Sequence, residues 1–202
     1  MKLFLKSLVL IFGLIIVATF SFAAEIKIGV AEALTGPIAK YGVPIRNGFT
    51  LAAEEINGAG GINGNKINLI IEDEQGKKEE AINVFKKFIF QDKVLAIFGP
   101  TLSNSAFAAD PVANAGKTVV FGTSNTAEGI TAIGTYVFRN SIAEADILPA
   151  VIKVSKNKLG LKKVAIMYGN DDSFTKSGYD VFKKAIDAEG LQIVATETFA
   201  KG

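Results

Sequence analysis

Apolar residues along this chain form two kinds of pattern, short continuous runs and longer segments with helical spacing. The runs are typical of buried strands and cover residues 26–33, 67–73, 94–98, 117–122, 135–140, 163–169 and 191–199. Helical spacing lies between them, as at Ile45, Phe49 and Ile56, at Ala81, Val84 and Phe88, within alanine-rich 104–115, at Ile147, Val151 and Val154, and at Tyr179, Phe182 and Ile186. This alternation predicts an α/β fold with a mostly parallel sheet and right-handed crossovers.

The order of these elements predicts two units of different extent. The strands between residues 26 and 139 are enough for a doubly wound parallel sheet, which gives an α/β lobe at 24–140. The same pattern starts again after residue 141 but contributes only two strands before residue 202. Because a two-stranded sheet has long uncovered edges, we interpret 141–202 as a hinge crossing and the first part of a second, similar lobe. We therefore expect the sequence to be part of a longer protein.

The first 23 residues have the pattern of a secretory signal peptide. Lys2 and Lys6 precede an uncharged apolar stretch at 8–20, and small residues follow at Ser21 and Ala23, the positions that a signal peptidase reads. An uncleaved membrane anchor is the alternative, because this uncharged region approaches the length of a membrane span. The short apolar stretch followed at once by small residues favours cleavage after Ala23, and hence an exported, periplasmic protein.

Composition narrows the chemistry that the chain can perform. Its 202 residues include neither cysteine nor histidine, which removes disulfides, thiol nucleophiles, Ser-His and Cys-His catalysis and the usual zinc, copper and iron ligands. The two lysines of the signal account for the formal charge of +2, so the remaining chain is neutral overall. A neutral chain has little long-range field to attract nucleic acid or an anionic membrane. We expect neither a nucleic-acid partner nor a cofactor.

Hydroxyl and amide side chains gather in the loops after the first, third and fourth predicted strands. These loops read EALTGPIAKYG at 32–42, GPTLSNS at 99–105 and GTSNTAEG at 122–129, with Lys40 as their single cation. In an open parallel sheet, ligands bind beyond the carboxyl ends of the strands. Free amides at a helix N-terminus, with hydroxyls such as those of Ser103 and Thr126, can hold a carboxylate without a cation.

These polar clusters also have simpler explanations. Ser103, Asn104 and Thr126 belong to the residue types that cap helices, so each can serve its own helix alone. We interpret the acids at 72–74 as a strand end with acids at the next helix N-terminus, in preference to a hard-metal site. The glycine-rich segment 57–66 follows a helix instead of a strand, which favours a turn over a phosphate-binding loop.

The sequence resembles the leucine/isoleucine/valine-binding family of periplasmic substrate-binding proteins, which supply amino acids to ABC transporters. The motifs that carry the resemblance are IKIGVAEALTGPIAKYG at 26–42, INGAGGINGNKINLIIEDEQGKKEEA at 56–81, IFGPTLSNSA at 97–106 and GTSNTAEGIT at 122–131. It extends from Ile26 to the end of the sequence. It implies the type I periplasmic binding protein fold, in which two doubly wound lobes joined by a hinge close around a ligand.

The resemblance also implies a ligand-binding site without catalytic or metal-binding residues. Its members are Ser103 and Thr126 for the ligand α-carboxylate, Ser124 for backbone contacts, Leu102 for the ligand side chain, Tyr41 at the pocket mouth and Phe174 on the second lobe. The family often has tyrosine at the last position, so a hydroxyl is missing there. The residues that bind the ligand ammonium group fall after Gly202.

We therefore expect a monomeric substrate-binding protein of an ABC importer. Its ligand would be a small amino acid of branched-chain type, held between two lobes by hinge closure, and its partners would be membrane permease subunits. A ligand-sensing domain of a receptor or regulator is the alternative on the same fold. An exported enzyme is disfavoured, because the sequence has no histidine or cysteine and shows no paired nucleophile and base.

Overall fold

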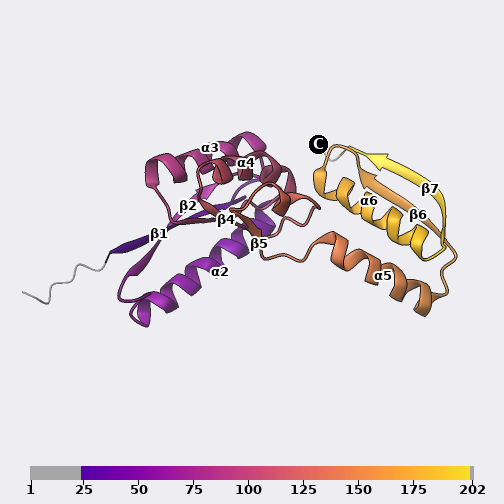
Figure 1. Cartoon of the computed structure of the whole chain (residues 1–202), viewed down its shortest axis with the longest axis horizontal. Helices are drawn as coiled ribbons and strands as arrows, with labels where there is room; N and C mark the ends of the chain where they lie inside the picture. Colours follow the sequence, from indigo (N-terminus) through magenta and orange to yellow (C-terminus); the bar gives the residue numbers. More distant parts are fainter. Residues whose placement is uncertain (1–23, 201–202) are drawn as a thin grey trace, which may run out of the picture.

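The computed structural model describes residues 24–200, so the predicted signal peptide lies outside the described residues. Figure 1 shows two α/β lobes joined through the segment that leads into α5. The first lobe contains β1 (Glu25–Glu32), α2 (Ala39–Gly58), β2 (Lys66–Asp73), α3 (Lys78–Lys86), the π-helical turn η1 (Lys87–Asp92), β3 (Ala96–Phe98), α4 (Ser103–Ala115), β4 (Val119–Gly122), the 3-10 turn η2 (Ile130–Ala132) and β5 (Val137–Arg139). The second contains α5 (Glu144–Leu159), β6 (Lys163–Gly169), α6 (Ser173–Ala188) and β7 (Gln192–Phe199).

The first lobe has a five-stranded parallel sheet in the order β2-β1-β3-β4-β5. Helix α2 covers one face of the sheet, and α3 and α4 cover the other (Figure 1). Because all of the strands run the same way, β1, β3 and β4 end at the same edge. The parallel sheet and the order of strands and helices confirm the α/β class predicted from the sequence.

The main core lies between the sheet and helices α3 and α4. Its fully buried members include Phe85, Phe88, Ile97 and Val120. Helix α4 contributes mainly alanines to this core, and such small side chains let it lie close to the neighbouring elements. This packing fixes α4, and with it the β3–α4 loop, at the edge where the strands end.

Phenylalanine rings line the opposite face of the sheet, on the side of α2. Phe98, Phe121 and Phe138 are paired in register on β3, β4 and β5. Their ring centroids are 5.7 Å and 5.4 Å apart, and the Phe49 ring of α2 packs tilted against Phe98 with centroids 4.4 Å apart. These contacts link the three short strands to each other and to α2.

Two glycines let backbone segments approach each other at the strand ends. A Cβ atom at Gly42 would lie 2.1 Å from the carbonyl oxygen of Ala33, so α2 passes directly over the residues that follow β1. Gly99 has a φ of +121°, and a Cβ atom there would lie 2.0 Å from the carbonyl oxygen of Ala31. These contacts bring the start of α2 and the β3–α4 loop to the end of β1.

Two helices begin earlier than the apolar spacing predicted. Helix α2 begins at Ala39, which places Tyr41 in its first turns instead of in a loop. The sequence pattern missed this start because Gly42 and Pro44 are typical of loops, whereas here both lie inside the helix. Helix α4 begins at Ser103 and continues through Pro111 to Ala115.

The second lobe has β6 and β7 in parallel, with α6 packed against them and α5 packed against α6. Its smaller core contains Ile152, Ile166, Ala185, Ile186 and Leu191. The apolar face predicted for α5 is present but little covered, since Ile147, Val151 and Val154 are 41%, 44% and 51% exposed. Much of the apolar surface of this lobe is therefore not packed against other described residues.

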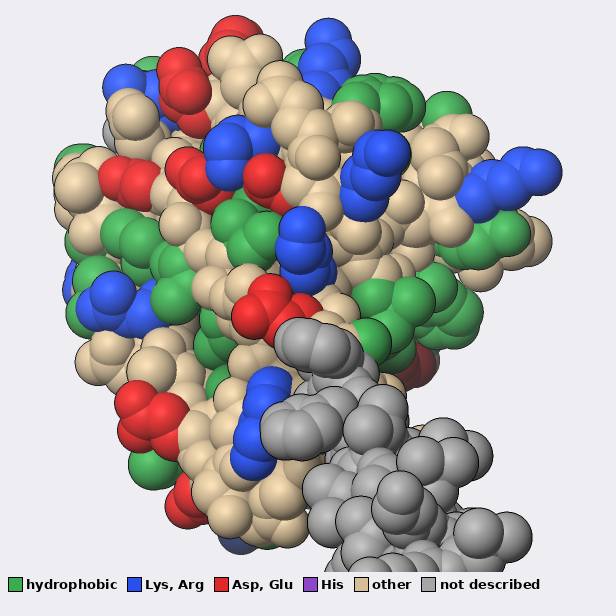
Figure 2. Space-filling view, turned by 90° about the vertical axis from the view of Figure 1, so that its left-hand side faces the viewer, with side chains coloured by type: hydrophobic (Ala, Val, Ile, Leu, Met, Phe, Trp, Pro, Cys, Tyr) green, Lys and Arg blue, Asp and Glu red, His purple; other side chains and the backbone are tan. Residues whose placement is uncertain are grey.

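The described surface carries charges of both signs. Figure 2 shows lysine and arginine side chains interspersed with aspartate and glutamate over one end of the first lobe. This mixture agrees with the balanced composition of the chain that follows residue 23. Among residues 24–200, no helix combines the length and apolar character that crossing a membrane requires.

Candidate ligand-binding site

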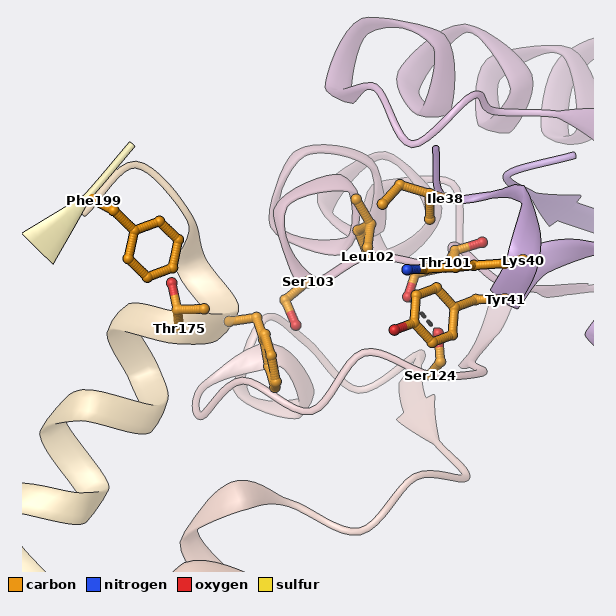
Figure 3. Close-up of a pocket in the computed structure, with 10 residues that line it drawn as sticks. Ile38, Lys40, Tyr41, Thr101, Leu102, Ser103, Ser124, Thr175 and Phe199 are labelled. Atoms are coloured by element: carbon orange, nitrogen blue, oxygen red, sulfur yellow. Dashed lines mark hydrogen bonds between the residues drawn. The ribbon is translucent and has the colours of Figure 1, made fainter. Parts of the chain in front are cut away.

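A cavity of about 420 Å³ lies where the strand ends of the first lobe face the second lobe (Figure 3). Its walls combine apolar and hydroxyl side chains, namely Ile38, Lys40, Tyr41, Thr101, Leu102, Ser103, Ser124, Phe174, Thr175 and Phe199. In Figure 3, Thr175 and Phe199 lie on one side, Lys40 and Tyr41 on the other, and Ser103 between them. A cavity of this size and lining can enclose a small organic molecule.

The structure brings most of the predicted site residues together around this cavity. Tyr41, Leu102, Ser103, Ser124 and Phe174 all line it. The remaining one, Thr126, lies just behind the lining, with its amide nitrogen 3.3 Å from the Ser103 hydroxyl oxygen. The six residues come from α2, the β3–α4 loop with the start of α4, the loop after β4, and α6, segments that are far apart in the sequence.

Ser103 links the two loops that follow β3 and β4. It is 3% exposed, and its Oγ accepts hydrogen bonds from the amides of Thr126 and Ala127, both at 3.3 Å. The N-cap residue of α4 is Leu102, which has extended backbone and makes no side-chain capping bond. The alternative in which Ser103 only caps its own helix is therefore wrong, because its hydroxyl holds the neighbouring loop instead.

Thr126 has a hydroxyl with unused hydrogen-bonding capacity. Its Oγ1 is buried and has no hydrogen-bond partner among residues 24–200. A buried hydroxyl without a hydrogen-bond partner lowers the stability of the folded state by about 1–3 kcal/mol, so few such groups occur in native structures. Thr126 does not line the cavity itself, but it lies directly beside Ser103, which does.

Further hydrogen bonds join the β3–α4 loop to the loop after β4. The Ser124 hydroxyl donates to the carbonyl oxygen of Thr101 at 2.6 Å, drawn as a dashed line in Figure 3. The Asn125 side-chain amide donates to the carbonyl oxygen of Pro100 at 2.9 Å. The two loops thus form one hydrogen-bonded unit, which keeps the polar side of the cavity in a fixed arrangement.

Asn104 contacts the second lobe. Its side-chain oxygen accepts from the Ser173 amide at 2.8 Å, and its side-chain nitrogen donates to Asp172 at 3.2 Å. Ser173 is the first residue of α6, so Asn104 caps a helix of the other lobe and not α4 as the capping alternative supposed. A second bond between the lobes runs from the Glu128 amide to the Ser177 hydroxyl at 2.9 Å.

Two buried glutamates lie behind the β3–α4 loop, and the sequence analysis did not identify them as part of the site. The Thr101 hydroxyl accepts from the Ala33 amide at 2.8 Å and donates to Glu32 at 2.6 Å. The Ser105 hydroxyl donates to Glu74 at 3.0 Å. Both carboxyl groups are fully buried. The one available signal was that Glu32 interrupts an otherwise apolar stretch.

Burial controls the ionisation of both glutamates. Desolvation raises the pKa of Glu32 to about 7, against the lowering effect of the nearby Thr101 and Thr123 hydroxyls, and the charge of Glu74 adds to the rise. Desolvation likewise raises the pKa of Glu74, against the lowering effect of the Ser105 hydrogen bond and of the nearby Thr101. Both acids therefore favour the neutral form more than an exposed glutamate does.

The interpretation of the acids at 72–74 needs correction. They do lie at the end of β2, but α3 begins only at Lys78, so they are not at its N-terminus. Asp73 accepts from the Leu34 and Gln75 amides and the Thr35 hydroxyl, which ties the loop after β1 to β2. Among residues 24–200, no group of three or more acidic side chains is placed to hold a metal ion.

Comparison with known proteins agrees with this geometry. The periplasmic binding protein family model matches residues 25–202, and the chain belongs to this family, in its leucine/isoleucine/valine-binding branch. The Leu/Ile/Val-binding protein BraC3 of Rhizobium johnstonii is 31% identical over 193 residues, which are 93% of this chain and 52% of BraC3. The chain spans about half the length of the curated relatives that it matches.

Solved structures show the same fold. LivJ of Streptococcus pneumoniae, a branched-chain amino acid transporter substrate-binding protein crystallised with isoleucine, has a TM-score of 0.82 and 31% identity, over 88% of this chain and 50% of LivJ. A solute-binding protein of an ABC transporter from Rhodopseudomonas palustris BisB5, in complex with 3,4-dihydroxybenzoic acid, has a TM-score of 0.78 and 27% identity, over 87% of this chain and 47% of that protein. The type I periplasmic binding protein fold predicted from the sequence is confirmed.

Proposed function

We propose that the chain belongs to an extracytoplasmic substrate-binding protein of an ABC importer and binds the carboxylate of a small molecule without catalysis. The observation that carries this proposal is the buried, unpartnered hydroxyl of Thr126 beside Ser103, at the strand ends that border the cavity. Together with the α4 N-terminus, these groups supply hydrogen-bond donors that suit a carboxylate. Ser124 contributes through the backbone of its loop.

The walls of the cavity favour an amino acid with an apolar side chain. The side chains of Ile38, Leu102, Phe174 and Phe199 give it apolar walls, and the Tyr41 ring also borders it. Moving an aliphatic group from water onto such a surface makes the free energy of binding more favourable. The relatives named for leucine, isoleucine and valine binding support a branched-chain ligand.

An aromatic carboxylate is a second candidate. Three aromatic rings, those of Tyr41, Phe174 and Phe199, border the cavity and can pack against a ring. Solved structures of related proteins hold 3,4-dihydroxybenzoic acid and 4-hydroxybenzoate. This candidate keeps the carboxylate at Ser103 and Thr126 and changes only the group that the apolar walls receive.

We further propose that the ligand is enclosed by two lobes and delivered, by a monomer, to membrane permease subunits. The cavity already receives Phe174, Thr175 and Phe199 from the second lobe. The exposed apolar face of α5 supports a larger second lobe in the whole protein, as does the greater length of the relatives. Residues of that lobe would bind the ammonium group of an amino acid.

Titration calorimetry on the full-length gene product tests the proposal, with leucine, isoleucine, leucinamide and 4-hydroxybenzoate as probes. We expect leucine or isoleucine to bind at least about tenfold more tightly than leucinamide, because the amide lacks the charge that the hydroxyls and helix amides recognise. Tighter binding of 4-hydroxybenzoate would select the second candidate. If none of the carboxylates binds, or if leucinamide binds as well as leucine, the proposed carboxylate site is wrong.

A further inference from the structure

Hydrogen bonds to two buried glutamates anchor the segment that carries Ser103. Thr101 and Ser105 stand two residues before and two residues after Ser103, and each donates its hydroxyl to a buried glutamate. Glu32 comes from the end of β1, and Glu74 directly follows β2. The Glu74 amide also donates to the Glu32 carbonyl oxygen at 3.0 Å. The two glutamates are thus adjacent, and together they support both sides of Ser103.

Each glutamate uses only part of its hydrogen-bonding capacity. The Oε1 atoms of Glu32 and Glu74 are buried and have no hydrogen-bond partner in residues 24–200. The ion pairs found in that part of the chain involve Lys87 and Lys156 and not these acids. Without a cation or a full set of donors, burial opposes the charged form of each group.

The surrounding charges are mainly negative. Glu74 faces Glu32, and Asp73 faces Glu74 from the end of β2. The other groups that act on the pair are the neutral hydroxyls of Thr101, Thr123 and Ser105. Lys40 of α2 is the single cation in the lining of the cavity. An anion that binds at Ser103 is therefore near Thr101 and Ser105, whose hydroxyls contact the buried acids.

We propose that Glu32 and Glu74 are positioning residues of the ligand site, which hold Thr101 and Ser105 in place and take up a proton when a carboxylate occupies the site. The proposal rests on the proposed function, since it requires a carboxylate at Ser103. The glutamates do not touch the ligand in this arrangement. They act through the two hydroxyls and through their charge.

The coupling has a definite sign. A bound carboxylate repels a nearby ionised glutamate, so binding favours the protonated form of the pair. By linkage, protonation of the pair favours binding to the same extent. At a pH where the pair is already neutral, binding takes up no proton. As the pH rises through the range in which the pair ionises, binding either draws a proton from solvent or brings like charges together, and affinity falls.

The test measures leucine binding to the full-length protein by calorimetry between about pH 6 and about pH 8.5, in buffers of different ionisation enthalpy. If 4-hydroxybenzoate is the tighter ligand, it replaces leucine as the probe. We expect wild type to take up protons on binding and to lose about tenfold in affinity over this range. Glu32→Gln should flatten both the pH profile and the proton uptake, because the amide cannot titrate. Glu74→Gln should reduce them in part.

Asp110→Asn is the matched control. Asp110 is another fully buried acid of the same lobe, and neither of its oxygens has a hydrogen-bond partner among the described residues, so it does not hold the loop. This variant should keep the wild-type pH profile and proton uptake. A second pair of variants tests the positioning role, since Thr101→Val should weaken binding about tenfold or more and Thr101→Ser should restore it.

The two proposals fail in different ways. If wild type binds no carboxylate probe at any pH, the proposed function is wrong. If wild type binds with no proton uptake, or if Glu32→Gln keeps the wild-type profile, the coupling is wrong and the proposed function stands. Equal affinity of Thr101→Val and wild type would overturn the positioning role. Should Glu32→Gln fail to fold, the proton uptake of wild type and the Glu74→Gln profile still decide the question.

Discussion

The hydroxyls of Ser103 and Thr126 are in different states before any ligand binds. Ser103 already accepts two amide hydrogen bonds, whereas the Thr126 hydroxyl has no partner among the described residues. The Ser103 hydroxyl still has its proton to donate, because both of its observed bonds use it as an acceptor. A ligand carboxylate can therefore receive one hydroxyl donor from each residue without breaking an existing bond.

We predict that Ser103→Ala and Thr126→Ala each weaken carboxylate binding by about 1–3 kcal/mol, because each leaves a charged oxygen short of a donor. Stability without ligand should change by about 1 kcal/mol or less for Thr126→Ala, whose hydroxyl contributes no observed bond. Calorimetric titration beside apo melting curves separates the two effects. Thr131→Ala, at an exposed site in the same lobe, is the control. Lost stability with unchanged affinity would assign these hydroxyls a structural role only.

Asp110 gives a second prediction at this scale, concerning stability and pH. Its burial in α4 raises its pKa to about 8, so the folded protein keeps this carboxyl protonated at a pH where the unfolded chain has released the proton. The resulting stability is present at low pH and is lost as the pH rises from the unfolded pKa through about 8. Asp110→Asn cannot ionise, so it should match wild type near pH 3 and exceed it by on the order of 5 kcal/mol near pH 8.5.

Denaturant unfolding at both pH values checks this prediction. Asn83→Asp, a change at an exposed position of α3, controls for the general effect of pH on a carboxylate of this lobe. An Asp110→Asn variant that follows the wild-type pH dependence would show that Asp110 ionises normally in the folded protein.

Three consecutive acids show why sequence patterns predict burial and position better than partners. Residues 72–74 look equivalent as letters, and their place at the end of a strand was predicted. In the structure, Glu72 pairs with Lys87 on the surface, Asp73 binds two amides and a hydroxyl, and Glu74 is fully buried against Ser105. The environment of Asp73 depends on the loop after β1, and that of Glu74 depends on α4. These contacts join segments that are far apart in the sequence, so a local pattern cannot predict them.

The elements themselves were more accessible to sequence reasoning, because strands and helices leave periodic patterns of apolar residues. All seven described strands fall within or close to their predicted ranges, and the polar loops after β3 and β4 were placed correctly at one edge. The start of α2 was missed, since Gly42 and Pro44 obscured it. The place of Gly42 inside the helix reflects its close packing against Ala33, just after β1, a tertiary demand that overrides local propensity.

Helix α2 offers a direct test of that packing. Gly42→Ala should destabilise the protein by at least about 2 kcal/mol, because the new methyl group would lie against the backbone of Ala33. Gly48→Ala, on the same helix, meets no atom within 4 Å and should stabilise it by about 0.5–1 kcal/mol through reduced backbone entropy of the unfolded chain. Thermal melts of the two variants give the comparison. Equal effects would mean that α2 does not sit as closely on β1 as described.

For the whole molecule, the side chain of Asn104 is the main polar link between the lobes. It joins the start of α4 to the start of α6, and the bond between Glu128 and Ser177 lies alongside. Both helices thus meet end to end beside the cavity. A change in the angle between the lobes would break these bonds and remove the acceptor that Asn104 gives to the Ser173 amide at the start of α6.

We predict that Asn104→Ala lets the lobes separate, which small-angle scattering would detect as a larger radius of gyration without ligand. Leucine should bind to this variant several-fold more weakly, because binding must restore the closed arrangement without that bond. Asn83→Ala, at an exposed site on α3, should leave both quantities unchanged. Unaltered scattering and affinity in Asn104→Ala would show that the contact does not contribute to closure.

The row of phenylalanines on the first sheet has a consequence for how the molecule acquires its fold. Strands β3, β4 and β5 are three or four residues long, so their ladders contain few hydrogen bonds, and the aligned rings of Phe98, Phe121 and Phe138 add cohesion where the backbone offers little. Every strand pairing of this sheet joins segments within residues 25–139. Because synthesis starts at the N-terminus, all five strands of this sheet are available before β6 and β7 have been made, and the sheet can assemble without them. The order of synthesis and the order of folding then coincide.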